Sequence, residues 1–118
     1  MRIGILEDNQ ALGNMLKLSL GLAGHTVHTS HTVNGFLTFV TSPTPPNLII
    51  VDYHLIGDFS GTDVIRHIRT IQPNLPAILI SAAPLTKLEA AAAGISKVKI
   101  LQKPFKMLAL QETITTIT

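Results

Sequence analysis

Short runs of apolar and β-branched residues alternate along the chain with longer segments in which apolar residues recur every three or four positions. The short runs predict strands, because they are too short for helices and are flanked by polar residues, Gly or Pro. The five predicted strands are residues 2–6, 26–29, 48–51, 77–80 and 98–101.

The longer segments predict helices, because their apolar residues fall on one side of a helix with 3.6 residues per turn. Gly24 and Gly94 follow the first and fourth of these segments, where a residue with positive φ commonly ends a helix. Pro104 suits the first turn of the last segment, where its missing N–H is not needed. The five predicted helices are residues 11–22, 33–40, 62–71, 85–93 and 105–117.

The alternation of strands and helices predicts an α/β fold, with one parallel sheet and helices on both of its faces. The nearly continuous apolar sequences LIIV and ILI, in the third and fourth strands, support a sheet that is buried on both sides. The 118 residues suffice for one hydrophobic core, so we expect a single domain over residues 1–118. The Pro-rich residues 42–46 then form a surface connection.

Composition and charge exclude several classes of protein. A hydrophobic share of 46% against a charged share of 14% argues against disorder. The net charge is only +2 and basic residues do not cluster, so we expect no direct nucleic-acid binding. The chain has no Cys, which excludes disulfides. No apolar run reaches the roughly 18 residues of a membrane span. We therefore expect a soluble, cytoplasmic protein without membrane attachment.

Residues suited to metal or phosphoryl chemistry lie just beyond four of the five predicted strands. Glu7 and Asp8 follow the first strand, Asp52 the third and Ser81 the fourth, and Lys103 lies two residues beyond the fifth. The carboxyl ends of parallel strands meet at one edge of a sheet, and ligands bind where the strand order reverses. In the order 2-1-3-4-5 that point lies between the first and third strands, which brings the three acidic residues together.

Three adjacent carboxylates repel one another unless a cation or a proton relieves the repulsion. Hard oxygen ligands of this kind favour Mg²⁺ or Mn²⁺. The ammonium of Lys103 and the hydroxyl of Ser81 both suit the oxygens of a phosphoryl group. Asp52 is the natural nucleophile, because carboxylates can form aspartyl-phosphates. The sequence thus predicts a site for a metal ion and a phosphoryl group.

These residues resemble the motifs of the response regulator receiver domains of two-component signal transduction, including the chemotaxis regulators. The resemblance extends from residue 3 to about residue 117. It implies a flavodoxin-like fold and transfer of a phosphoryl group to Asp52 from a phosphohistidine of a histidine kinase or histidine phosphotransfer protein. The motifs are Glu7-Asp8, Asp52 after LIIV, Ser81-Ala82 after ILI, and Lys103-Pro104-Phe105.

The resemblance also implies how the metal is bound. Asp8, Asp52 and the backbone carbonyl of His54 would ligate Mg²⁺, and Glu7 would act through a water molecule. No other cofactor is implied. The domain would assist its own phosphorylation and dephosphorylation, yet its role would be signalling and not enzymatic turnover.

Two further residues would respond to phosphorylation. Lys103 would pair first with the acceptor and then with the phosphoryl group, and Ser81 would reorient toward it. The Lys103-Pro104 bond is expected to be cis. The change would reach the face formed by the fourth helix, fifth strand and fifth helix, which could contact an output domain or a second copy of the chain.

Four positions depart from the usual family pattern. Ile100 lies three positions before Lys103, where the family usually has an aromatic residue that moves together with the Ser or Thr on activation. The chain therefore lacks the aromatic side chain that usually takes part in this change. Ile56 replaces a common Pro in the loop after the acceptor, and that loop is one residue longer before Gly61. His54 and Ala83 occupy positions thought to tune phosphate lifetime, so we expect an altered rate of hydrolysis.

Two other functions are compatible with parts of this pattern. A Mg²⁺-dependent phosphohydrolase similar to the haloacid dehalogenase-like phosphatases would use Asp52 as its nucleophile. Such enzymes need a second Asp where this chain has His54. A degenerate receiver that binds partners without phosphorylation is permitted by Ile100, whereas the presence of Asp8, Asp52 and Lys103 favours phosphorylation.

Overall fold

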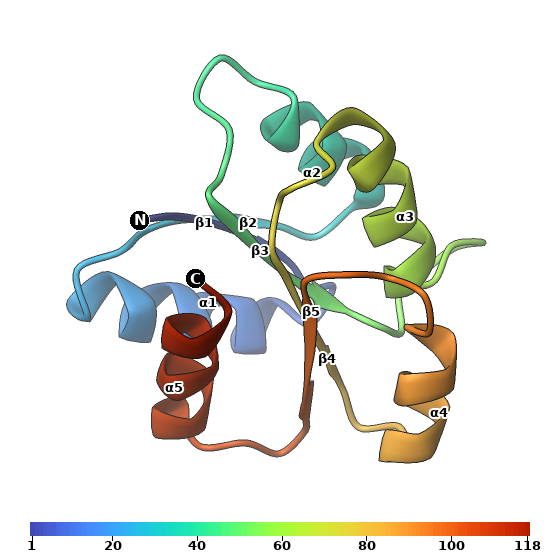
Figure 1. Cartoon of the computed structure of the whole chain (residues 1–118). Coiled ribbons are helices and arrows are strands. Elements are labelled where there is room, and N and C mark those ends of the chain that lie inside the picture. The colour runs from blue at the N-terminus through green and yellow to red at the C-terminus, as the bar shows by residue number, and fades with distance from the viewer.

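The computed structural model describes all residues 1–118 and contains one parallel sheet (Figure 1). The order β2-β1-β3-β4-β5 confirms the predicted flavodoxin-like fold. Four of the strands end one residue later than predicted, and for β3 that last residue is Asp52. The strands are β1 (Arg2–Leu6), β2 (Thr26–Ser30), β3 (Leu48–Asp52), β4 (Ala77–Ser81) and β5 (Val98–Gln102).

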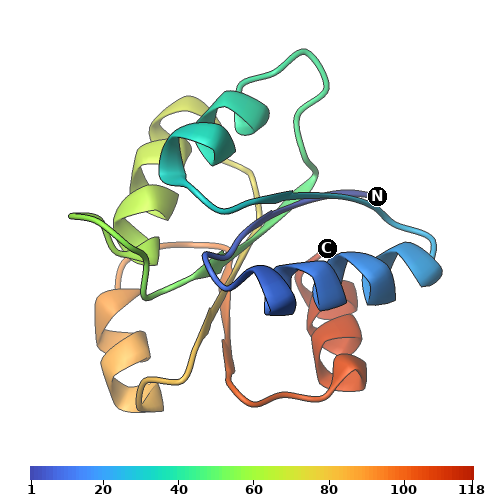
Figure 2. The same ribbon diagram turned by 180° about the vertical axis from the view of Figure 1, so that it is seen from behind.

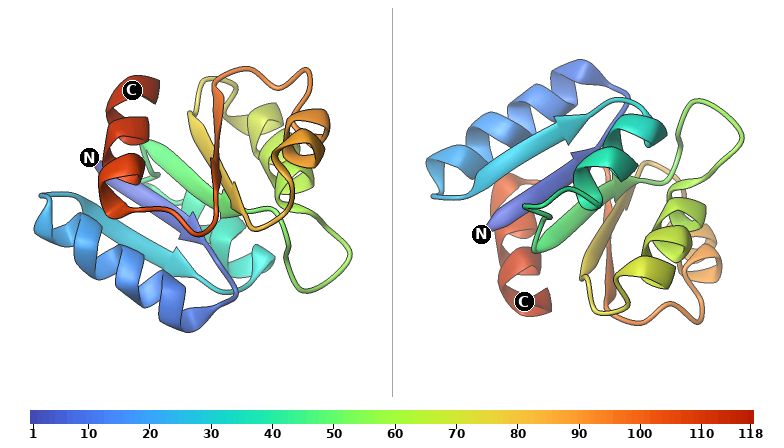
Figure 3. Two further views of the ribbon diagram at one scale, coloured as in Figure 1. Left: turned by 90° about the horizontal axis from the view of Figure 1, so that it is seen from below. Right: turned by 90° about the horizontal axis from the view of Figure 1, so that it is seen from above.

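Five helices cover the two faces of the sheet. Figures 2 and 3 show α1 and α5 on one face and α2, α3 and α4 on the other. None of these helices combines the length and apolar character needed to cross a membrane. The helices are α1 (Gln10–Leu22), α2 (Val33–Val40), α3 (Gly61–Ile71), α4 (Leu85–Ala91) and α5 (Met107–Ile117).

The last two helices differ from their predicted bounds. α5 begins at Met107, because Lys106 has an extended backbone and forms the N-cap. Pro104 therefore lies before the helix and not in its first turn, and the Lys103-Pro104 bond is cis, as the resemblance implied. α4 ends at Ala91, and the turn after it includes Gly94 at φ 81°. Gly24 also has a positive φ, of 97°, as predicted.

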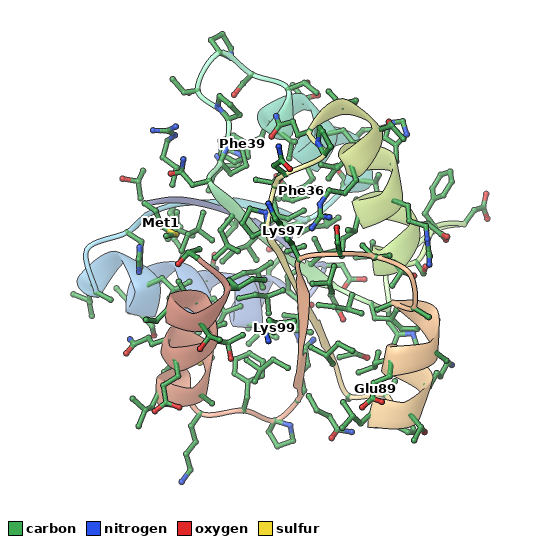
Figure 4. All side chains as sticks on the ribbon, viewed as in Figure 1. Met1, Phe36, Phe39, Glu89, Lys97 and Lys99 are labelled. Carbon is green, nitrogen blue, oxygen red and sulfur yellow. The ribbon has the colours of Figure 1, made fainter.

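The core consists of two apolar layers, one on each face of the sheet. β3 and β4 are buried at every position, so the strands that end at Asp52 and Ser81 are the most enclosed. On the α2 side the rings of Phe36 and Phe39 lie close to β1 (Figure 4). A Cβ on Gly4 would lie 2.9 Å from the Phe39 ring, so glycine is needed for α2 to pack this closely.

Candidate functional site

The three acidic residues meet at the carboxyl edge of the sheet, as their positions after β1 and β3 predict. β1 and β3 are neighbours, with Leu6 paired to Val51. One carboxylate oxygen each from Glu7, Asp8 and Asp52 lies within 4.8 Å of the others. A group of three oxygens at this spacing could hold a metal ion.

Burial distinguishes the three carboxylates. Glu7 is 1% exposed and Asp52 only 5%, whereas Asp8 is intermediate. Asp52 is enclosed because Lys103 and the backbone of the following loop lie against its carboxylate. The Asp52 Oδ2 is 3.4 Å from the ammonium of Lys103, and Oδ1 accepts a hydrogen bond of 3.3 Å from the backbone N–H of His54.

Lys103 contacts two of the acids at once. Its ammonium donates a hydrogen bond of 3.0 Å to Glu7, which is shorter than its 3.4 Å contact with Asp52. One ammonium against three ionised carboxylates leaves a net charge of −2 (+1 − 3) in the group. That charge and the hard oxygen donors fit a divalent cation.

The titration of Glu7 reflects its enclosure. Burial raises the pKa of Glu7 above its ordinary value, and the nearby charge of Asp52 acts in the same direction. The hydrogen bonds from Lys103 and from the backbone N–H of Asn9 oppose this effect on the pKa. Without a cation, burial therefore makes ionisation of Glu7 less favourable than that of an exposed Glu.

Ser81 is fully buried at the end of β4. Its Oγ accepts a hydrogen bond of 3.0 Å from the backbone N–H of Ala83. The backbone N–H of Lys103 donates to the Ser81 carbonyl at 2.7 Å. The connection after β5 is thereby attached directly to the end of β4.

The imidazole of His54 lies outside the acidic group. It is exposed, and its ring meets the ring of Tyr53 edge-on with the centroids 5.0 Å apart. The contribution of His54 to the acidic group in this structure is its backbone N–H. Metal ligation by its carbonyl stays a prediction.

Two residues of the site were missed by sequence reasoning. Gly61 begins α3, and a Cβ there would collide with the carbonyl oxygen of Asp52, so only glycine permits this approach. His31 forms a 3.0 Å hydrogen bond from its Nδ1 to the carbonyl of Glu7. The glycine after the acceptor loop was noticed only for its spacing, and nothing in the sequence links His31 to Glu7.

Comparison with known proteins points to one family. The family model for the response regulator receiver domain matches residues 3–115. Transcriptional regulatory protein FixJ of Rhizobium meliloti (strain 1021) is 24% identical over 112 residues, which cover 95% of this chain and 54% of FixJ. Response regulator MprA of Mycobacterium avium (strain 104) is 27% identical over 114 residues, which cover 97% of this chain and 48% of MprA. The chain thus spans about half the length of these curated relatives.

Solved structures share the fold at lower sequence identity. The chemotaxis protein CheY4 of Vibrio cholerae aligns with a TM-score of 0.90 and 17% identity, covering 99% of this chain and 98% of CheY4. The response regulator protein TrrA of Thermotoga maritima, in complex with Mg(2+)-BeF, aligns with a TM-score of 0.85 and 22% identity. That alignment covers 99% of this chain and 98% of TrrA.

Proposed function

Because the chain belongs to the response regulator receiver domain family of two-component systems, we propose that it is a phosphoacceptor switch in which Asp52 receives a phosphoryl group in a Mg²⁺-dependent reaction. The observation that carries the proposal is the group of Glu7, Asp8 and Asp52, with Lys103 in contact, at the carboxyl edge of the sheet. The donor would be a phosphohistidine of a histidine kinase or histidine phosphotransfer protein.

The residues that would hold Mg²⁺ are Asp8, Asp52 and the backbone carbonyl of His54, with Glu7 acting through a water molecule; Mn²⁺ suits the same oxygen donors. The net charge of the group supports this assignment, as does the Mg(2+)-BeF complex of TrrA, which shares the fold. A bound Mg²⁺ would supply positive charge to the carboxylates and to the phosphoryl oxygens.

In the transfer, a carboxylate oxygen of Asp52 forms the new bond to phosphorus. The bond from phosphorus to the donor imidazole nitrogen breaks, and its electron pair stays on that nitrogen. The ammonium of Lys103 lies 3.4 Å from Asp52, within reach of the oxygens of the incoming group. The Asp52 carboxylate is kept in place by the His54 N–H and by its position at the end of a buried strand.

The product would act as a signal and not as an intermediate of turnover on a separate substrate. The domain would promote its own phosphorylation and hydrolysis, because the groups around Asp52 are its own. The backbone N–H of Lys103 is hydrogen-bonded directly to the carbonyl of Ser81. This bond supports the proposal that a change at the site shifts the ends of β4 and β5. Through the face of α4, β5 and α5 the change would reach an output domain or a second copy of the chain.

Phosphorylation can be tested with a small phosphodonor. Incubation with acetyl phosphate and Mg²⁺ should add the mass of one phosphoryl group to the intact protein, and hydroxylamine should remove it. The adduct should vanish with EDTA and in Asp52→Asn. Asp58→Asn is the matched control, because Asp58 is exposed and outside the acidic group, and it should be labelled normally. An adduct that persists in Asp52→Asn, or no adduct at all, would overturn the proposal.

A further inference from the structure

The side chain of Gln102 bridges the ends of two neighbouring strands. Gln102 is the last residue of β5 and lies opposite Ser81 in the register of β4 and β5. Its side-chain amide donates a hydrogen bond of 2.9 Å from Nε2 to the backbone carbonyl of Ala83. The bond therefore joins the end of β5 to the loop that follows β4.

The same loop holds the hydroxyl of Ser81. The hydrogen bond of the Ser81 Oγ is with the backbone N–H of Ala83, at 3.0 Å, and Ser81 is fully buried. The hydroxyl is thus directed to its own loop, with no hydrogen bond to Asp52 or to the Lys103 ammonium. The Oγ accepts this bond, so its own proton stays free to donate. If the Oγ moves toward a phosphoryl group on Asp52, its bond from the Ala83 N–H lengthens.

We infer that Gln102 is a positioning residue that restrains the Ser81 hydroxyl in the unphosphorylated protein; the inference rests on the proposed phosphorylation of Asp52. The chain of contacts runs from Gln102 Nε2 to the Ala83 carbonyl, and from the Ala83 N–H to the Ser81 Oγ. Loss of the Gln102 bond frees the loop and makes the phosphorylated arrangement easier to reach. Gln102 thereby adds to the stability of the resting state.

The position of Gln102 allows this role to be separated from a purely structural one. Gln102 is exposed on an edge strand, so substitutions there leave the core packing intact. Gln72 makes the same kind of bond elsewhere, from its Nε2 to the carbonyl of Val40 at 2.9 Å. Loss of the Gln72 bond should affect its own surroundings and leave Ala83 unchanged.

The test compares Gln102→Glu and Gln102→Leu with Gln72→Glu in the full chain. Neither Glu nor Leu can donate to the Ala83 carbonyl. Hydrogen exchange of the Ala83 amide, followed by NMR without any phosphoryl analogue, should be about five-fold faster in both Gln102 variants. The reason is that loss of a typical hydrogen bond raises the equilibrium constant for local opening by about that factor. At fixed Mg²⁺, the concentration of beryllium fluoride that half-saturates the Gln102 variants should be about five-fold lower than for the wild type. Gln72→Glu should match the wild type in both measurements.

Each outcome decides a different statement. Unchanged exchange at Ala83 in the Gln102 variants would overturn the restraint itself. Faster exchange with unchanged beryllium fluoride binding would overturn its link to phosphorylation, while leaving the proposed function of Asp52 intact. A wild-type protein that binds no beryllium fluoride and forms no Asp52 adduct would overturn the proposed function, and the inference with it.

Discussion

Glu7 connects several parts of the acidic site through its side chain and its backbone. Its carboxylate accepts hydrogen bonds from the Lys103 ammonium at 3.0 Å and from the Asn9 backbone N–H at 3.1 Å. Its own backbone carbonyl is bonded to His31. A residue predicted only as an outer contributor to metal binding therefore also holds Lys103 in place beside Asp52.

The raised pKa of Glu7 predicts how stability depends on pH in the absence of metal. A carboxyl group whose folded-state pKa is raised stabilises the fold below its unfolded-state pKa, and this contribution is lost as pH rises through the folded-state pKa. The contribution of Glu7 to the stability of the metal-free protein should therefore decline as pH rises above about 4.5, the ordinary pKa of a Glu side chain. The cause is the growing fraction of buried, ionised Glu7.

Urea unfolding over a pH series with EDTA tests this expectation. Glu7→Gln should remove part of the decline, whereas Glu112→Gln, on the exposed side of α5, should leave it unchanged. Mg²⁺ should add stability near neutral pH in the wild type, because a ligand that binds only the folded state stabilises it. Identical pH profiles for the wild type and Glu7→Gln would contradict this role of Glu7.

At the scale of elements, the junction between β3 and α3 places the acceptor. Ser60 caps α3 in a capping box with Asp63, whose pKa is lowered chiefly by the hydrogen bond from the Ser60 backbone N–H. The next residue, Gly61, donates its N–H to the Tyr53 carbonyl at 2.8 Å. The first turn of α3 is therefore packed directly against the backbone that carries Asp52.

Two glycine substitutions test this junction. Gly61→Ala should lower the free energy of unfolding by roughly 1–3 kcal/mol, the usual cost of overpacking, because its Cβ would collide with the Asp52 carbonyl. Gly21→Ala in α1 is the matched control. A Cβ there has nothing within 4 Å, so the same change should raise the free energy of unfolding by about 0.5–1 kcal/mol. Equal effects in a denaturant titration would contradict the close approach at Gly61.

At the scale of the whole molecule, Arg69 joins α3 to the connections that lead into β4 and β5. Its guanidinium donates to the carbonyls of Leu75 at 2.6 Å, Ser96 at 2.7 Å and Lys97 at 2.9 Å. Burial lowers the pKa of Arg69, but a guanidinium stays charged at neutral pH. Arg69 thus holds together the ends of β4 and β5 that lie opposite the acidic site.

Arg69→Lys should lower the free energy of unfolding by about 2 kcal/mol, because one ammonium cannot reproduce the three-carbonyl geometry. Arg2→Lys is the control, since Arg2 donates its Nε to one carbonyl, that of Pro45, at an exposed position. Its effect should stay within about 0.5 kcal/mol. Urea unfolding measures the free energy of unfolding of both variants. If Arg69→Lys lowers it no more than Arg2→Lys does, the three bonds of Arg69 contribute little to the stability of the fold.

The sequence by itself determined the elements and the general position of the site. Strands and helices could be predicted because periodicity and end signals are local properties of the chain. The acidic site could be predicted because strand order decides which strand ends are neighbours, and the order 2-1-3-4-5 places Glu7 and Asp8 beside Asp52. Neither step required knowledge of side-chain packing.

Only the tertiary structure decided which groups touch. The burial of Asp52, the shorter contact of Lys103 with Glu7 and the bond from Gln102 to Ala83 do not appear in any local pattern. Lys103 and Glu7 are 96 positions apart in the chain. Contacts across such separations depend on how the core layers pack and how each loop leaves the sheet, since a strand end places a residue at an edge but does not orient its side chain.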